Sequence, residues 1–464
     1  MARKPMSDVV VLLPGILGSI LSKGGQDVWG ISAGMVGRAL LSLGGNIQDL
    51  AIPSDAVDRP DFDDGVTATG LLQDTHLIPY LWKVDGYSLI ADTLRDNFEL
   101  EAGRNYFELP YDWRLDNRVA ARKLQAQSSQ WLRDWRESSG NKDAKLILIG
   151  HSMGGLVARY FLEVLEGWRD TRMLVTFGTP YRGSLNALNF IANGFAKKVG
   201  FLKLLDLSDM LRSFTSVYQL LPIYPCYDPR GDGKYVYLHE ATNIPNLDAA
   251  RVARAFEFHN EIRGAVERHL QDDEYLRDRY RIHPVVGTYQ PTLQSALWNG
   301  GAVEVLTEYE GKDLGGDGTV PRVSATPIEM SKAHAEVFVA GQHAALQNAE
   351  SVLFHLRGLL GDQEINLDRF RALSGRIALE VDDAYGTDER VALRARSEGD
   401  NELSVTIVNV ETGQAVASAT PERGLGEWQE AEFAPLPEGI YRATVSDVDG
   451  TAEPVSDIFA VLQN

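Results

Sequence analysis

Apolar residues along this chain follow two different patterns, one before about residue 372 and one after it. In the first part, short unbroken apolar runs alternate with stretches in which apolar residues recur every three or four positions. Unbroken runs predict strands buried on both faces of a parallel sheet, and the helical period predicts helices that cover that sheet. After about Gly375 apolar and polar residues alternate strictly, which predicts antiparallel strands with one buried face.

The alternation of runs and periodic stretches predicts an α/β fold whose parallel sheet is covered on both faces. The predicted strands are Val9–Leu13, Tyr106–Leu109, Leu146–Ile149, Met173–Phe177, Pro284–Gly287, Ala302–Leu306 and Glu336–Ala340. The predicted helices are Tyr87–Phe98, residues 119–135, Leu156–Leu165, Ala250–His269 and residues 346–359.

The pattern Gly150-His151-Ser152-Met153-Gly154 lies between a predicted buried strand and a predicted amphipathic helix. A chain that reverses from strand to helix in so few residues strains the central serine, and the glycines remove side chains that would clash. The serine hydroxyl then stands above the carboxyl end of the sheet, beside the free N–H groups of the helix amino terminus. We therefore interpret Ser152 as a catalytic nucleophile.

The loop Pro14–Ser19 follows the first predicted strand. In a hydrolase of this architecture such a loop supplies one N–H of the oxyanion hole, and the residue after the nucleophile supplies the other. The sequence thus indicates the backbone amides of Leu17 and Met153, with Ile16 as the neighbouring alternative to Leu17.

A serine nucleophile needs an imidazole as its base and a carboxylate that orients the imidazole. In this fold class the acid and then the histidine follow the serine, each after a later strand. Of the nine histidines, only His343 directly follows a late apolar strand, and Asp317 lies upstream of it in the Gly-rich loop 315–321. The predicted triad is Ser152, Asp317 and His343, with Asp313 as the rival acid.

The alternation stops between about residues 185 and 280, where we expect an inserted helical cap. Apolar side chains crowd residues 201–214, and they suit either an acyl chain or the cap's own core. The loop Asp228–Gly233 resembles a calcium loop only in outline, because Arg230 takes a ligand position, so we interpret it as a turn.

Residues 20–75 show little periodicity apart from a short predicted helix at Met35–Leu43. Two interpretations fit this segment, a flap near the site or a cover for the sheet edge. Asp112 and Arg114 are interpreted as a structural ion pair rather than as catalytic groups.

The chain is strongly acidic, with a formal net charge of −20. This balance argues against nucleic acid as a partner and against simple electrostatic binding to anionic membranes. Residues 371–464 contain seven arginines, no lysine and 18 acidic residues, so they carry −11 of the charge. The first part of the chain is therefore only mildly acidic.

Cys226 is the only cysteine, so neither an intramolecular disulfide nor a cysteine-based metal cluster forms within one chain. A reducing, cytoplasmic location is therefore expected. Arg3 and Lys4 precede the apolar run Val9–Leu13, but the run is short and Pro14 follows it, so we interpret it as a strand rather than a signal peptide. No segment has the apolar length of a membrane span.

The alternating pattern of the tail predicts a small antiparallel β-sandwich of about seven strands. Turn residues such as Asp400-Asn401 and Glu438-Gly439 separate the strands. We therefore expect a catalytic domain in residues 1–372 and a β-sandwich domain in residues 373–464. The sandwich either binds a partner or supports the structure.

Six features, in order over about residues 9–360, resemble the lecithin:cholesterol acyltransferase family, which includes lysosomal-type phospholipases A. They are VVLLPGILGS at 10–19, PYDWR at 110–114, GHSMGG at 150–155, GTPYRGS at 178–184, GDGTVP at 316–321, and His343 after the last strand. The resemblance implies an α/β-hydrolase fold with Ser152, Asp317 and His343 as the triad. It also implies an oxyanion hole made by the Leu17 and Met153 amides.

Animal members of that family carry disulfides, one of which staples a lid containing a tryptophan. The corresponding region here has Trp29 but no cysteine, so the chain resembles a bacterial-type intracellular member. The resemblance does not extend to the sandwich.

These features predict a serine acyl-ester hydrolase or acyltransferase, of the phospholipase A or LCAT-like type, that acts through an acyl-enzyme without metal or cofactor. Hydrolase and transferase differ only in the second acceptor, and no motif separates them. The expected partners are a lipid or other acyl-ester substrate, a transient contact with a membrane surface, and a protein bound by the C-terminal domain. The alternative is a non-catalytic module in which the sandwich engages a protein partner.

Overall fold

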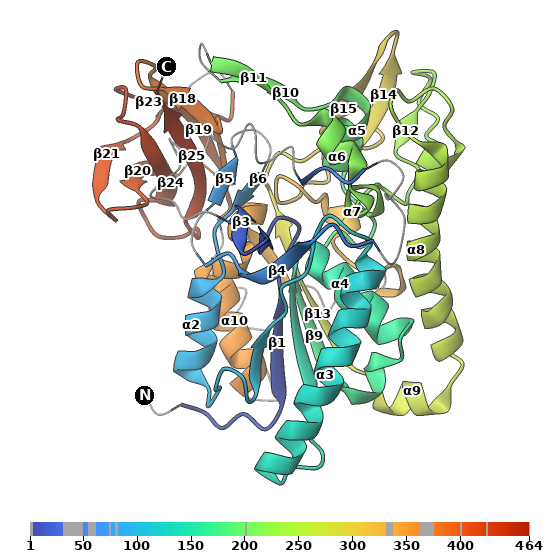
Figure 1. Cartoon of the computed structure of the whole chain (residues 1–464). Coiled ribbons are helices and arrows are strands. Elements are labelled where there is room, and N and C mark those ends of the chain that lie inside the picture. Colours follow the sequence, from blue (N-terminus) through green and yellow to red (C-terminus); the bar gives the residue numbers. More distant parts are fainter. Residues whose placement is uncertain are drawn as a thin grey trace.

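The computed structural model describes residues 3–30, 50–53, 62–73, 76–78, 82–199, 202–330, 337–361, 375–399, 401–423 and 426–463. Its larger part is a parallel sheet with helices on both faces, and its C-terminal part is a pair of β-sheets beside the upper end of that sheet (Figure 1). The α/β-hydrolase fold and the C-terminal sandwich predicted from the sequence are confirmed.

The parallel sheet has the strand order β16-β13-β9-β8-β1-β7. Every pairing within it is parallel, so the carboxyl ends of the strands gather at one edge, where ligands bind in folds of this class. The strands are β1 (Val9–Leu13), β7 (Tyr106–Glu108), β8 (Leu146–His151), β9 (Thr171–Phe177), β13 (Arg281–Thr288) and β16 (Val337–Ala340).

Helices cover both faces of this sheet, which explains its unbroken apolar runs. The odd-numbered residues of β1 pack into one core with α3 and α4, whereas Val10 and Leu12 pack into a second core with α2 and α10. Successive strand residues point to opposite faces, so a strand covered on both sides needs apolar residues throughout. The helices are α2 (Ser88–Asn97), α3 (Asn117–Ser139), α4 (Met153–Glu163) and α10 (Glu350–Gly361).

The segment between β9 and β13 is not the purely helical cap expected from the sequence. It also contains an antiparallel hairpin and the short strand β12, so part of the apolar stretch at 201–214 is a strand. Composition alone does not separate a short apolar strand from a helix. The elements are α5 (Leu185–Asn193), β10 (Ala196–Val199), β11 (Leu202–Asp206), α6 (Ser208–Ser213), α7 (Thr215–Gln219), β12 (Tyr227–Asp228), α8 (Ala249–His269) and α9 (Asp273–Asp278).

The expectation that Ala302–Leu306 joins the parallel sheet was wrong. This strand, β15, pairs antiparallel with β14 (Ser295–Asn299), and β14 pairs with β12 in a separate small sheet. Gly300-Gly301 connects the two strands, and a two-glycine loop favours a local hairpin. Val303 and Val305 alternate with Glu304 in β15, a period of two that fits a sheet with one open face.

A small antiparallel sheet lies between β1 and α2 in the chain. It consists of β2 (Ser19–Lys23), β3 (Gln26–Trp29) and β4 (Val66–Leu71). The predicted helix at Met35–Leu43, and with it much of the flap hypothesis, lies outside the described residues. A hairpin of β5 (His76–Ile78) and β6 (Trp82–Val84) follows.

Arg114 is fully buried and contacts Asp112 at 2.7 Å and Asp64 at 3.0 Å. Its side chain also donates a hydrogen bond to the Leu50 carbonyl. The predicted ion pair between Asp112 and Arg114 is therefore present, and it joins the segment after β7 to the segment before β4.

The sandwich consists of a sheet β17-β19-β23-β22 and a sheet β18-β25-β24-β20-β21. Its described residues form more strands than the seven expected, and the pair β18–β25 is parallel while the others are antiparallel. The strands are β17 (Ile377–Val381), β18 (Ala384–Gly386), β19 (Val391–Ser397), β20 (Leu403–Asn409), β21 (Ala415–Ala419), β22 (Glu422–Arg423), β23 (Gln429–Phe433), β24 (Gly439–Asp447) and β25 (Val455–Leu462).

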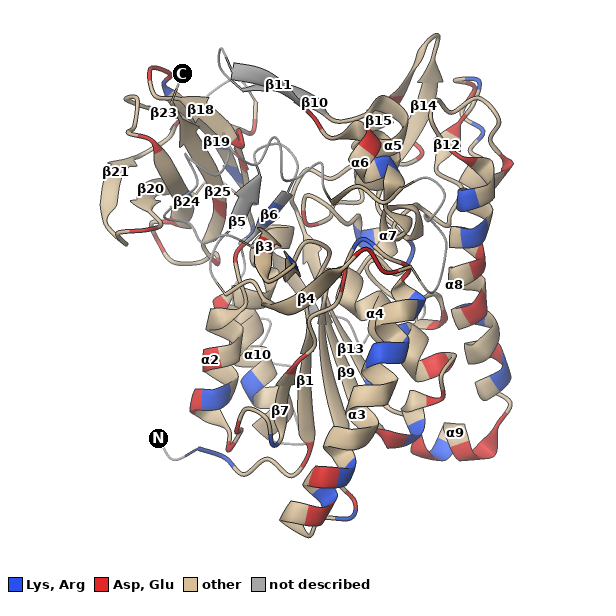
Figure 2. Ribbon diagram, viewed as in Figure 1, with Lys and Arg blue, Asp and Glu red and all other residues tan. Residues whose placement is uncertain are grey.

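The surface carries charges of both signs, which are interspersed along α3 and α8 (Figure 2). Among the described residues, no helix combines the length and the apolar composition that a membrane span requires. Cys226 is fully buried, and burial raises the pKa of its thiol well above the usual range.

Candidate active site

Ser152 occupies the turn between β8 and α4, at the carboxyl edge of the parallel sheet. Its backbone has φ 51° and ψ −123°, a left-handed conformation that non-glycine residues rarely adopt. The Ser152 amide donates to the Phe177 carbonyl at 2.8 Å, and the Ser152 carbonyl accepts from the Thr179 hydroxyl at 2.9 Å. These bonds hold the strained turn that the G-x-S-x-G pattern predicts.

Gly154 allows the loop after β1 to approach the turn. A Cβ atom on Gly154 would stand 2.5 Å from the Pro14 carbonyl oxygen and 2.7 Å from that of Leu13. The glycine thus has a second role besides relieving the turn itself, because it lets the predicted oxyanion loop pack directly against the start of α4.

The structure brings Ser152, His343 and Asp317 together in one hydrogen-bonded row. His343 Nε2 lies 2.9 Å from Ser152 Oγ, and His343 Nδ1 lies 2.7 Å from Asp317 Oδ2. A neutral imidazole with its proton on Nδ1 donates to the carboxylate and accepts from the serine hydroxyl. All three residues are at least 95% buried, with exposed fractions of 4% for Ser152, 5% for His343 and 1% for Asp317.

Asp317 is held by the loop in which it lies. Its Oδ1 atom accepts hydrogen bonds from the amides of Thr319 at 2.9 Å and Val320 at 2.7 Å, which leaves Oδ2 for the imidazole. The Asp317 carbonyl also accepts from the His343 amide at 2.8 Å. The carboxylate and the imidazole are therefore positioned relative to each other by both side chain and backbone.

The rival acid Asp313 lies elsewhere. Its carboxylate accepts from Gln294 Nε2 at 2.7 Å and from the Gly315 amide at 2.8 Å, so it organises the start of the Gly-rich loop. The geometry favours Asp317.

The predicted oxyanion loop has a left-handed residue at Leu17, with φ 62°. Across the part of the chain that the structure describes, neither the Leu17 nor the Met153 amide donates a turn or loop hydrogen bond to the backbone. Met153 is the first residue of α4, where N–H groups have no helical partner. The two amides fit an oxyanion hole, and this role stays a prediction.

Three aromatic side chains that the sequence analysis did not assign to the site hold this loop. Tyr111 Oη donates to the Pro14 carbonyl at 2.7 Å, Trp113 Nε1 to that of Ser19 at 3.1 Å, and Trp29 Nε1 to that of Leu17 at 2.8 Å. Tyr111 and Trp113 belong to the PYDWR motif, so the motif was visible in the sequence but its contact with the loop was not.

His151, the residue before the nucleophile, links two loops of the site. Its Nε2 lies 3.2 Å from the His343 carbonyl oxygen, and its Nδ1 lies 2.8 Å from the Tyr87 hydroxyl, which accepts from the Gly15 amide at 2.8 Å. A carbonyl only accepts, so Nε2 carries the proton and Tyr87 donates to Nδ1. Burial, together with the nearby His343, lowers the pKa of His151 to about 3, which keeps the ring neutral.

An apolar slot opens beside Ser152. Its lining comes from the oxyanion loop, from the loop after β9, from helices α5 to α7 and from the loop that holds Asp317. The lining includes Ile16, Leu17, Pro180, Ala187, Phe190, Leu211, Phe214, Val217, Leu220 and Val320. The cap residues among them support the expectation that some cap side chains face the site rather than the cap's own core. The described residues contain no group of side chains arranged to bind a metal ion.

Comparisons with known proteins agree with the motifs. The lecithin:cholesterol acyltransferase family model matches residues 58–262. The chain is 26% identical over 234 residues to a dog lysosomal phospholipase A and acyltransferase, which covers 47% of this chain and 54% of that protein. It is 28% identical over 116 residues to a chicken phosphatidylcholine-sterol acyltransferase, covering 24% of this chain and 27% of that protein.

The chain thus spans about half, or less, of the length of these curated relatives. Among solved structures, the mature form of a Bacillus licheniformis lipase is similar with a TM-score of 0.36 and 13% identity, covering 78% of this chain and 95% of that one. The sequence matches confirm the predicted resemblance of this chain to the lecithin:cholesterol acyltransferase family.

Proposed function

We propose that this protein is a serine acyl-ester hydrolase or acyltransferase that acts on lipid through an acyl-enzyme intermediate. The observation that carries the proposal is the row Ser152, His343 and Asp317, with contacts of 2.9 and 2.7 Å, at the mouth of an apolar slot. A hydroxyl, a base and an orienting carboxylate in this order are the arrangement for acyl transfer.

In the first half-reaction, His343 Nε2 removes the Ser152 proton while Oγ attacks the ester carbonyl carbon. The carbonyl oxygen becomes an oxyanion, which the Leu17 and Met153 amides stabilise. The C–O bond to the alcohol then breaks, and His343 returns the proton to the departing alcohol. Asp317 stabilises the imidazolium that exists between the two proton transfers.

In the second half-reaction, water or another alcohol gives its proton to His343 and attacks the acyl-enzyme. The bond between the acyl carbon and Ser152 Oγ breaks, and the proton returns to the serine. Water yields a fatty acid and an alcohol yields a new ester, so one set of residues serves both outcomes.

The apolar slot supports a lipid acyl group as the part that Ser152 receives. Its walls are aliphatic and aromatic, with few polar groups beside the nucleophile, and burial of a CH₂ group contributes about 0.8 kcal/mol. The dog relative is named lysosomal phospholipase A and acyltransferase, which supports the same substrate class.

The test is covalent labelling of the full chain with a fluorophosphonate probe, followed by mass spectrometry of the labelled peptide. We expect one modification, on Ser152, and its loss in both Ser152→Ala and His343→Ala. A folded wild-type protein that stays unlabelled would favour the non-catalytic binding module instead.

Turnover of radiolabelled phospholipids with and without an added long-chain alcohol separates hydrolase from transferase. A labelled wax ester or other alkyl ester in the second reaction identifies an acyltransferase, whereas free fatty acid alone identifies a hydrolase. The cytoplasmic location stays a prediction, supported by the single cysteine of the chain and its burial.

A further inference from the structure

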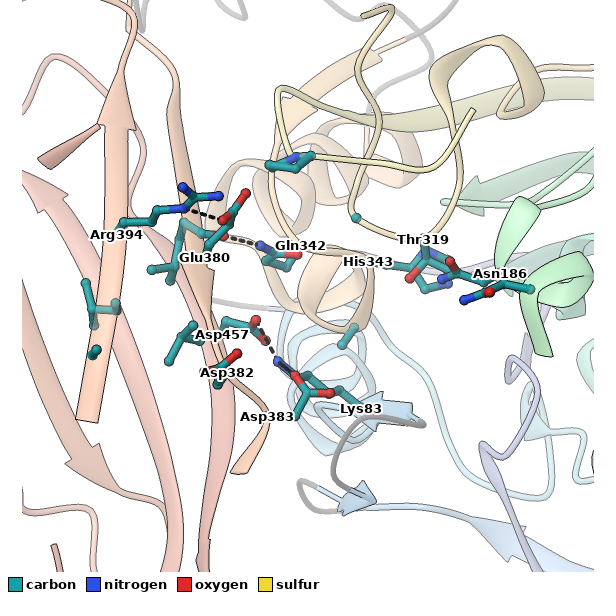
Figure 3. A pocket seen from close by; sticks show the side chains of 18 of the residues that line it. Lys83, Asn186, Thr319, Gln342, His343, Glu380, Asp382, Asp383, Arg394 and Asp457 are labelled. Carbon is teal, nitrogen blue, oxygen red and sulfur yellow. Dashed lines mark hydrogen bonds and ion pairs between the residues drawn. The ribbon is translucent and has the colours of Figure 1, made fainter. Parts of the chain in front are cut away.

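A second cavity, of about 880 Å³, lies on the other side of His343, between the catalytic part of the chain and the sandwich. Its volume is within the range of ligand sites. Figure 3 shows His343, Thr319 and Asn186 on one side of it and Glu380 and Arg394 of the sandwich on the other. We call this cavity the polar chamber.

The polar chamber and the apolar slot meet at the triad. Asn186, Phe190 and Thr319 line both of them, while Ser152 faces the slot and His343 faces the chamber. An ester bound at Ser152 has an acyl part and an alcohol part, and these extend from the carbonyl carbon in different directions. The two cavities therefore match the two halves of such a substrate.

The sandwich supplies a built wall of the chamber. On strands β17, β19 and β23 the side chains of one face pack inside the sandwich, and those of the other face line the chamber. Strand register places Arg394 between Glu380 and Glu430, and Ala392 opposite Glu432. Ala392 has the smallest side chain among these cross-strand neighbours, so the chamber is open beside it.

Hydrogen bonds fix this wall to the catalytic histidine loop. Gln342, the residue before His343, donates from Nε2 to the Leu379 carbonyl at 2.9 Å. Gln290, which is 1% exposed, donates to the Ile377 carbonyl at 2.9 Å and accepts from the Leu379 amide at 3.2 Å. Strand β17 is therefore attached to the site at the position of the base.

An ion-pair cluster closes the lower side of the chamber (Figure 3). Lys83 Nζ lies 2.7 Å from both Asp383 Oδ1 and Asp457 Oδ2. Arg394 is likewise paired, with Glu380. Both basic side chains of the lining are thus bound to sandwich carboxylates.

The charge of the lining selects what the chamber accepts. Six acidic side chains stand against two basic ones, and the two basic ones are already paired. The net negative charge of the lining repels an anionic group. It does not repel a neutral hydroxyl group, and it attracts a cation. Glu430 and Glu432 of β23 are exposed members of this lining, and Glu432 is paired with Arg390 at 2.9 Å, so the lining stays negative in sum.

We propose that the polar chamber binds the alcohol part of the ester, or the acceptor alcohol, and that it selects polar alcohols without net negative charge. The proposal rests on the acyl-transfer function proposed above. In it the sandwich is a wall of the substrate site, and Glu430 and Glu432 of β23 are specificity-determining residues.

The experiment compares esters that share one octanoyl group and differ in the alcohol, which is glycerol, choline or glycerol phosphate. For the wild type we expect kcat/KM to be highest for the choline ester, lower for the glycerol ester and lowest for the glycerol phosphate ester. The double variant Glu430→Gln, Glu432→Gln should lower the choline value about fivefold, raise the glycerol phosphate value by a similar factor, and change the glycerol value less than twofold. Glu422→Gln, on β22 of the same sheet but outside the chamber lining, is the matched control and should change none of them.

A second variant, Ala392→Trp, places a large side chain in the chamber from the sandwich wall. We expect at least a tenfold loss of kcat/KM for the glycerol and choline esters, while the rate of fluorophosphonate labelling at Ser152 and the melting temperature stay unchanged. Normal turnover of all three esters by both the double variant and Ala392→Trp would overturn the proposal for the chamber. Absence of labelling in the wild type would instead overturn the proposed function itself.

Discussion

Gly178 lies directly against Asp317 at the end of β9. A Cβ atom added to Gly178 would stand 2.7 Å from Asp317 Oδ2 and 2.8 Å from His343 Nδ1, which are the two atoms of the hydrogen bond between His343 and Asp317. Its φ of 53° is also in the left-handed region. At position 178 there is therefore room for the hydrogen atom of a glycine but not for a Cβ atom.

Gly178→Ala should remove most of the activity, by about 100-fold or more, because the methyl group separates the carboxylate from the imidazole. The measurement is kcat/KM for an octanoyl ester, with the melting temperature beside it. Gly103→Ala is the matched control, since Gly103 has φ 79° but nothing within 4 Å of an added Cβ atom. Both variants share the cost of a left-handed alanine, about 1 kcal/mol, so only the active-site loss distinguishes them. Equal activity in the two would contradict the geometry.

Asp317→Asn should lower kcat by about 10³-fold or more, since an amide no longer stabilises the imidazolium and favours the wrong tautomer. Asp313→Asn should retain activity within about threefold, because its carboxylate contacts Gln294 and Gly315 rather than a histidine. Steady-state kinetics on both variants decide between the two acids. A larger loss in Asp313→Asn would reverse the assignment.

Tyr87→Phe should lower kcat by about tenfold while KM changes little. The variant leaves the buried Gly15 amide and His151 Nδ1 without their common partner, at a cost of about 1–3 kcal/mol, and it loosens both the oxyanion loop and the His343 backbone. Tyr106→Phe is the control, because among the described residues that hydroxyl donates a hydrogen bond to Glu108, at 3.3 Å, away from the site. A drop in melting temperature without any change in kcat would show that Tyr87 serves stability alone.

The protein should lose stability on acidification below about pH 6.5. Burial lowers the pKa of His151 to about 3 and those of His259 and His283 to about 4. Between these values and the ordinary value of about 6.5, the unfolded chain binds protons that the folded chain does not, so the free energy of unfolding falls as pH falls.

His259 tests this dependence by itself. Its Nε2 lies 2.8 Å from the Gln219 carbonyl, and glutamine supplies a donor that does not titrate. Relative to the wild type, His259→Gln should lose about 2 kcal/mol less between pH 7 and pH 5 in urea unfolding. Parallel curves for the wild type and His259→Gln would refute the assignment.

Local patterns in the sequence were sufficient to locate the strands of the central sheet, although they added Ala302–Leu306 to it wrongly. The apolar runs at Val9–Leu13 and Leu146–Ile149 are β1 and β8, because strands buried on both faces need no partner information to be recognised. Ser152, Asp317 and His343 were predicted as separate loop residues, and the parallel sheet brings their loops to one edge. The chain order of the triad was therefore sufficient to predict its assembly.

Two kinds of feature were not predicted, one local hairpin and the contacts between distant segments. Ala302–Leu306 was assigned to the wrong sheet because its hairpin partner has only a weak strand pattern. The contact between Trp29 Nε1 and the Leu17 carbonyl, and that between Gln342 and β17, depend on tertiary placement that no local period encodes. The polar chamber is of this kind too, since its two walls are distant in the chain.

Cys226 is the single thiol of the chain, and it is sealed inside the catalytic part. Maleimide and other thiol reagents need a thiolate that they can reach, and this one is neither ionised nor accessible. An added surface cysteine, for example at Glu432 on the sandwich wall, would therefore carry a spin label or fluorophore without background. A label attached there would report what enters between the two parts of the molecule.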